Sequence, residues 1–176
     1  GEVAGSYMTI VGGSDEKDVA STDLIINGGT YTYIIGGGLG KSVTGNVNML
    51  IGSSANGQPY LYGGSFRGNV GGNVTVQSYL NNVFEVIGGS YKGNVEGNTD
   101  ITLDGNQSLD PNAGQIYAPY DITAGSSLGH VTGNTSLTIG KGMYTINGTD
   151  VFGGSIGEIN SAIISQMRYG IKELYD

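Results

Sequence analysis

The chain contains no cysteine and no tryptophan, and only three of its 176 residues are proline. Without cysteine there is no disulfide framework, no thiol catalysis and no cysteine-ligated zinc site. The low proline content excludes collagen-like and proline-rich disordered chains, even though 34 residues are glycine. The fold therefore cannot depend on disulfide cross-links, and the glycines need another explanation.

Charged residues and long apolar segments are also scarce. Charged residues make up 12% of the chain and hydrophobic residues 38%, a balance typical of a folded domain rather than a disordered chain. The net charge of -8 argues against nucleic acid or an anionic membrane surface as a partner, because both attract basic patches. No apolar run approaches the roughly 18 residues that a membrane-spanning helix needs. We expect a domain of an extracellular or cell-surface protein, as a monomer or as part of a larger chain.

A degenerate repeat runs through most of the sequence. It is clearest in residues 61–76 and 86–101, where both copies contain Gly-Gly-Ser, then Gly-Asn-Val and then Gly-Asn. The double glycine, or Ala-Gly in one copy, begins at Gly12, Gly36, Gly63, Gly88, Ala124 and Gly153. Repeats of roughly 20–50 residues are the signature of solenoids, propellers and arrays.

Columns of equivalent residues indicate which of these architectures applies. An aliphatic residue stands two positions before every double glycine: Ile10, Ile34, Leu61, Val86, Ile122 and Val151. A valine stands further along in the first five copies: Val19, Val43, Val70, Val95 and Val131. After Asn46, Asn73, Asn98 and Asn134 the residues alternate with period two, which indicates half-buried strands.

Stacking of these repeats explains the columns. One repeat is too short to bury its own aliphatic residues, but stacked repeats bury a continuous column. The pattern therefore predicts an all-β fold, a single-stranded parallel β-helix of about six coils over residues 1–157. It disfavours a propeller, whose blades need roughly 40 residues and four antiparallel strands. We expect Gly and Asn to supply corners with φ > 0, and the Asn and Ser columns to form hydrogen-bond ladders.

Residues 158–176 differ from the repeats and predict an amphipathic helix. Asn160 or Ser161 can cap its start, and apolar residues follow at helical spacing: Ile163, Met167, Ile171 and Leu174. Such a helix would either cover the exposed end of the last coil or link it to another domain.

Residues beside the aliphatic column are expected to point outwards and to form the candidate ligand site. Stacked coils would bring an aromatic patch next to an acidic ladder: Tyr33, Tyr60, Tyr62, Glu85, Asp121 and Asp150. Tyrosine rings with carboxylates suit a carbohydrate, and aligned carboxylates would also suit Ca²⁺ or the catalytic pair of a glycosidase. Alternatively, tyrosine is simply a good strand former, and acids on a solvated sheet face need no ligand.

Other chemistry-bearing residues are few. His130 is the only histidine, and no nucleophile motif accompanies it, so we assign no catalytic residue and no metal ligand. Apart from Ca²⁺, no cofactor is expected. Arg67 and Lys92 occupy equivalent positions in two repeats, where they could receive an acidic group or offset the charge of an acidic surface.

The Gly-Gly-Ser, Gly-Asn-Val and Gly-Asn-Val/Thr pattern over roughly residues 5–157 resembles the adhesin-like surface proteins of gut and oral bacteria. The repeats of those proteins are assigned to the pectate-lyase-like β-helix, so the resemblance implies right-handed coils and a cell-surface or secreted, non-catalytic adhesin or stalk. It also implies a carbohydrate or a host-surface molecule as the ligand. The Asp clusters of pectate lyases and polygalacturonases have no residue-by-residue counterpart here. The alternative function is a small polysaccharide-active enzyme, a lyase or glycoside hydrolase, that uses the acidic ladder.

Overall fold

The computed structural model describes residues 8–105, 121–140 and 150–157, and in these ranges all regular structure is β-strand. The odd-numbered strands form a first sheet: β1 (Met8–Val11), β3 (Gly29–Ile35), β5 (Ala55–Tyr62), β7 (Glu85–Ile87), β9 (Asp121–Thr123) and β11 (Asp150–Phe152). The even-numbered strands form a second sheet: β2 (Thr22–Ile26), β4 (Val47–Ile51), β6 (Val74–Ser78), β8 (Thr99–Leu103) and β10 (Thr135–Ile139).

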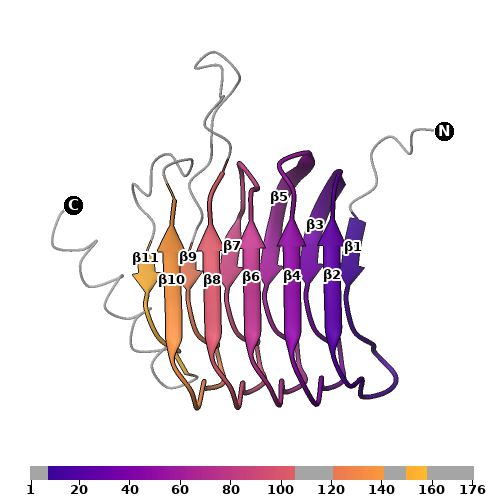
Figure 1. Ribbon diagram of the computed structural model, residues 1–176, viewed down its shortest axis with the longest axis vertical. Coiled ribbons are helices and arrows are strands. Elements are labelled where there is room, and N and C mark those ends of the chain that lie inside the picture. Colours follow the sequence, from indigo (N-terminus) through magenta and orange to yellow (C-terminus); the bar gives the residue numbers. More distant parts are fainter. Residues whose placement is uncertain (1–7, 106–120, 141–149, 158–176) are drawn as a thin grey trace, which may run out of the picture.

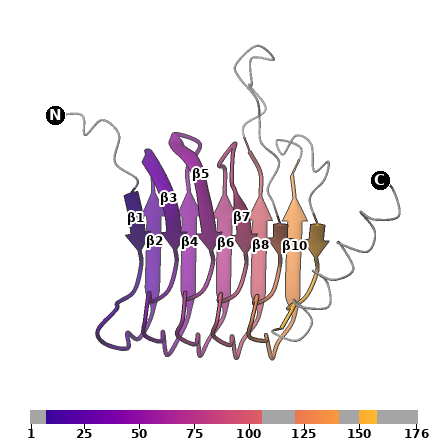
Figure 2. The ribbon, with the colours of Figure 1, turned by 180° about the vertical axis from the view of Figure 1, so that it is seen from behind.

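The chain winds from one sheet to the other and back, so each coil adds one strand to each sheet. Figures 1 and 2 show the sheets as facing layers whose strands run in opposite directions. Within each sheet every neighbouring pair is parallel, as in β4 with β6 and β6 with β8. The valine column forms a third line of contact through parallel bridges between successive coils. The predicted parallel β-solenoid is confirmed, with about five full turns.

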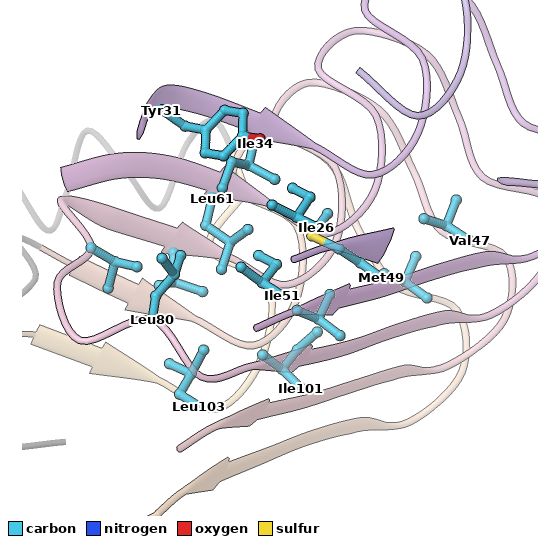
Figure 3. Close-up of a cluster of buried hydrophobic side chains, with 14 of the residues drawn as sticks. Ile26, Tyr31, Ile34, Val47, Met49, Ile51, Leu61, Leu80, Ile101 and Leu103 are labelled. Atoms are coloured by element: carbon cyan, nitrogen blue, oxygen red, sulfur yellow. The ribbon is translucent and has the colours of Figure 1, made fainter. Parts of the chain in front are cut away.

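The core lies between the two sheets and consists of the predicted inward columns (Figure 3). Ile34, Leu61 and Ile122 of the first sheet are fully buried, as are the bridging valines Val43 and Val70. Second-sheet strands alternate strictly, and β4 and β8 bury every other residue. Burial of each Leu or Ile contributes about 1.5–3 kcal/mol relative to exposure, so the stacked columns dominate stability.

The double glycines have a different role from the one expected. Among the described glycines only Gly29, Gly57 and Gly157 have positive φ, so the double glycines do not supply left-handed backbone. Instead, neighbouring coils approach so closely that a side chain has no room. A Cβ atom on Gly63 would lie 2.1 Å from the carbonyl oxygen of Gly88, and one on Gly36 would lie 2.3 Å from that of Gly63. Close backbone approach is the second property for which chains use glycine.

Serine and asparagine residues form ladders between coils. In both ladders a backbone N–H of one coil donates to a side-chain oxygen of the next coil or the one before it. In the buried serine ladder, the backbone N–H of Ser65 donates to Oγ of Ser90, and that of Ser90 to Oγ of Ser126, at 3.0 and 3.1 Å. In the exposed asparagine ladder, the N–H of Asn98 donates to Oδ1 of Asn73 at 2.8 Å. Each ladder satisfies backbone donors at a corner that has no regular strand pairing.

A second asparagine ladder accounts for the histidine. The backbone N–H of Asn94 donates to Oδ1 of Asn69 at 2.9 Å. The backbone N–H of His130 in turn donates to Oδ1 of Asn94 at 3.2 Å. His130 is therefore the last member of this column that the structure describes, as expected of a corner residue. The helix predicted over 158–176 lies outside the described residues. Within the ranges that are described, no helix is long and apolar enough to cross a membrane.

Candidate functional site

The predicted site residues fall into two neighbouring columns on the outer face of the first sheet. We call the first the outer column. It contains Tyr33 paired with Tyr60, Tyr60 paired with Glu85, and Asp121 paired with Asp150. Glu85 and Asp121 are also neighbours in this column, because the residues that follow them, Val86 and Ile122, are paired between β7 and β9. We call the second the floor column: Ile35, Tyr62, Ile87, Thr123 and Phe152.

Four of the five residues of the floor column are buried, although their side chains face outwards, and Phe152 is half-buried. Ile35, Tyr62 and Ile87 expose only 2%, 3% and 1% of their surface. A third column covers them, because the chain folds back after each double glycine and places Leu39, Phe66 and Tyr91 against them. Tyr62 therefore points away from the core between the sheets, but its ring lies largely beneath this covering column.

A groove lies between these columns at the first four coils. It has a volume of about 420 Å³. Its lining consists of Thr9, Tyr33, Ile35, Leu39, Tyr62, Phe66 and Tyr91. Since these residues come from successive coils, the groove extends along the stack. We call it the aromatic groove.

Ring contacts hold the groove in shape. The rings of Tyr33 and Tyr60 are stacked with centroids 4.9 Å apart, and those of Phe66 and Tyr91 are stacked at 5.1 Å. The Tyr62 ring lies 5.7 Å from Phe66 and 5.6 Å from Tyr91, which ties the floor to its cover. Each such pair adds about 0.5–1.5 kcal/mol beyond the burial of its surface. The groove is therefore a preformed surface.

Sequence reasoning missed Leu39, Phe66, Tyr91 and Phe84. The first three stand at the same position after the double glycine in consecutive repeats, so alignment could have revealed the column. Its position over the floor depends on the corner angle, which the pattern does not contain. Phe84 lies beside the site, with its ring 4.7 Å from that of Tyr60 and 41% of its surface exposed.

Glu85 provides the polar group nearest the aromatic residues. Partial burial raises the pKa of the Glu85 carboxyl above its ordinary value of 4.5, and the neighbouring Asp121 raises it further. The Tyr62 hydroxyl donates a hydrogen bond to Oε2 of Glu85 at 3.4 Å, which partly offsets these effects. Burial first, and the charge of Glu85 second, raise the pKa of Tyr62 well above the usual range, so this hydroxyl stays protonated.

The acidic ladder continues away from the groove toward the last coil. Asp121 is half-buried and Asp150 is exposed, so only Glu85 joins the aromatic residues directly. Among the described residues, no group of three or more His, Cys, Asp or Glu side chains could hold a metal ion. The hydroxyls of Tyr33 and Tyr91 have no protein partner in the described part of the chain, which leaves them available to a ligand.

The chain matches no known protein family model, and no characterised protein or solved structure is significantly similar to it.

Proposed function

We propose that this protein is a non-catalytic, extracellular carbohydrate-binding module, an adhesin or stalk, whose aromatic groove receives a stretch of glycan. One observation carries the proposal: the outer face of the first sheet bears an open apolar groove, and the Tyr33 and Tyr91 hydroxyls at its edges have no partner among the described residues.

The chemistry of the groove fits a sugar better than a purely apolar ligand. A sugar ring has apolar C–H faces and a rim of hydroxyls, and the groove offers Ile35 and Tyr62 below with Tyr33 and Tyr91 hydroxyls beside them. Apolar lining with a few polar groups is typical of small-molecule sites. Because the lining comes from four successive coils, a linear glycan lying along the stack would contact every coil of the groove.

The surface location rests on composition. An acidic chain without cysteine, rich in Gly, Asn, Ser and Thr, suits a stalk-like module that displays a binding face. A solenoid is a rigid, quasi-one-dimensional scaffold, and repeat proteins use such scaffolds to present extended binding surfaces.

Titration calorimetry with a panel of uncharged oligosaccharides tests the proposal. The wild type should bind at least one of them, and Tyr33→Ala should weaken binding about tenfold or more, as expected for loss of one anchoring ring. Tyr79→Ala is the matched control, because Tyr79 is also an exposed tyrosine, at 39%, but does not line the groove. Absence of binding to every glycan, or equal losses in both variants, would contradict the proposal.

A second candidate function is cleavage of a polysaccharide, favoured by the state of Glu85. Its pKa is raised and a second carboxylate, Asp121, lies beside it, and enzymes that use a carboxylic acid as general acid raise its pKa in the same direction. A reducing-end assay on the same glycan panel tests it. Cleavage that is lost in both Glu85→Gln and Asp121→Asn would establish an enzyme, whereas binding without product leaves the module non-catalytic.

A further inference from the structure

The positive charges of the described chain all lie on one edge of the solenoid. The described residues contain four lysines and arginines: Lys17, Lys41, Arg67 and Lys92. Each follows the double glycine of one of the first four coils and precedes that coil's bridging valine, and all four are exposed. The chain has a net charge of -8, and cations that only offset its acidic residues would be spread over the whole surface rather than aligned along one edge.

Backbone contacts align three of these cations into a line that we call the basic ridge: Lys41, Arg67 and Lys92. The N–H of Arg67 donates to the carbonyl of Leu39, and that of Lys92 to the carbonyl of Phe66, at 3.2 and 2.9 Å. The backbones of Lys41 and Gly68 are in contact, so Lys41 lies in the preceding coil and one position further along than Arg67. Arg67 and Lys92 are therefore separated at the backbone by about one strand spacing, roughly 4.8 Å, and Lys41 lies diagonally next to Arg67.

The ridge adjoins the covering column of the aromatic groove. The Arg67 guanidinium lies 5.6 Å from the centre of the Phe66 ring, and Nζ of Lys92 lies 5.9 Å from that of Tyr91. These ring contacts hold the cationic groups without neutralising them. Within the described ranges no carboxylate forms an ion pair with any of the three.

The ridge also has defined ends. At the first coil, Lys17 is in register with Lys41, but its neighbours in the sequence are Asp15, Glu16 and Asp18. Asp18 also accepts a hydrogen bond from the N–H of Ser42, so carboxylates close the line there. At the fifth coil, Leu128 takes the position of Lys92, donating its N–H to the Tyr91 carbonyl. The unneutralised positive charge thus spans three coils.

We infer that the basic ridge binds a linear anionic polysaccharide that carries a carboxylate or sulfate on its sugars. Like charges one coil apart repel one another, and a polymer with charges at a similar interval relieves that repulsion at each cation. The strand spacing is comparable to the length of one sugar unit. Nucleic acid fits less well, because its affinity needs a wide basic surface, whereas here the outer column of the first sheet continues into Glu85, Asp121 and Asp150.

This inference does not require the proposed function, because the ridge lies outside the lining of the groove. Its test uses two polymers with the same backbone, dextran and dextran sulfate, together with alginate as the carboxylate probe. Binding at low salt should be found for dextran sulfate or alginate and be absent or at least about tenfold weaker for dextran, and it should weaken steeply as salt increases. The two charged polymers distinguish sulfate from carboxylate recognition.

Charge reversal locates the site. Arg67→Glu and Lys92→Glu should each lower the affinity about tenfold and reduce the slope of log K against log salt by about one. Thr75→Glu is the control, since it adds negative charge on the outer face of the second sheet and should alter affinity less than about twofold. Thermal melts check that all three variants stay folded. The inference is overturned if neither charged polymer binds, if the Thr75 variant loses as much as the others, or if a single-stranded oligonucleotide binds more tightly than both polymers.

Discussion

The outer faces of the two sheets belong to the same coils but are built in different ways. On the second sheet, outward positions are exposed and mainly polar: Asp23, Asn48, Thr75, Asp100 and Ser136. On the first sheet, the outward residues Ile35, Tyr62 and Ile87 are buried beneath Leu39, Phe66 and Tyr91. Stacking of coils needs only the inward columns, so the second sheet shows what the fold requires. The apolar outer face of the first sheet is additional, which is why the binding proposal belongs there.

The largest effect should come from the corner that makes this difference possible. Gly63 begins the turn that brings Phe66 back over Tyr62, and its Cβ position lies 2.1 Å from a backbone oxygen. We expect Gly63→Ala to cost about 3 kcal/mol, because neither backbone can move without separating the coils. Gly28→Ala is the control, since its nearest atom is 3.7 Å away and its φ is not positive. Chemical denaturation measures both, and equal stability of the two variants would contradict the steric account.

Two isoleucines compare the faces directly. Ile87 on the outer face of the first sheet is 1% exposed, whereas Ile25 on the outer face of the second is 63% exposed. Ile87→Ala should therefore cost about 2–4 kcal/mol, as for a core position. Ile25→Ala should cost less than about 1 kcal/mol, which is the range of strand propensity. Similar decreases in the urea midpoint for the two variants would contradict the claim that the outer face of the first sheet is buried and that of the second is exposed.

Substitutions in the buried serine ladder should cost more stability than substitutions in the exposed asparagine ladder, but the difference should be smaller than that between the two isoleucines. Ser90→Ala leaves the buried N–H of Ser65 without an acceptor, which we expect to cost about 1–3 kcal/mol. Asn98→Ala removes the acceptor of the Asn134 N–H at an exposed corner, where water can replace it, so the loss should be about 0.5 kcal/mol. Hydrogen exchange at the amides of Ser65 and Asn134 provides a second readout. The larger increase in exchange rate is expected at Ser65.

The smallest effect concerns the pH dependence of stability through Glu85. Its pKa is higher in the folded protein than its ordinary value of 4.5, so the fold favours the protonated form. This contribution is complete below pH 4.5 and is lost as the pH rises through the raised pKa. Glu85→Gln should therefore be slightly more stable than the wild type at pH 7, and the difference should vanish in acid. A wild type that is the more stable of the two at pH 7 would show that Glu85 is not destabilised by its surroundings.

The fold could be predicted from the sequence because stacking imposes it on every repeat. Two patterns predict which side chains are buried: the aliphatic column that contains Ile34 and Leu61, and the period-two alternation after each Asn. The pairing of Tyr33 with Tyr60 and of Tyr60 with Glu85 also follows from alignment on the double glycine.

The shape of the site could not be predicted in the same way. Whether Tyr62 is exposed depends on the direction of the chain after Gly64, because only that direction places Phe66 and Tyr91 above it. The reason for the double glycine was also hidden, since a pattern cannot distinguish positive φ from a close approach between coils. Both depend on contacts between repeats rather than on the order of residues within one.

The most direct test of the account is to map where a bound glycan lies. Titration of the isotope-labelled protein with an uncharged oligosaccharide that binds should shift the amide signals of Tyr33, Ile35, Tyr62, Phe66 and Tyr91. Signals of the second sheet's outer face, such as those of Thr75 and Ser136, should stay unchanged. Shifts confined to the second sheet, or spread evenly over both faces, would contradict the claim that the apolar face of the first sheet is the binding surface.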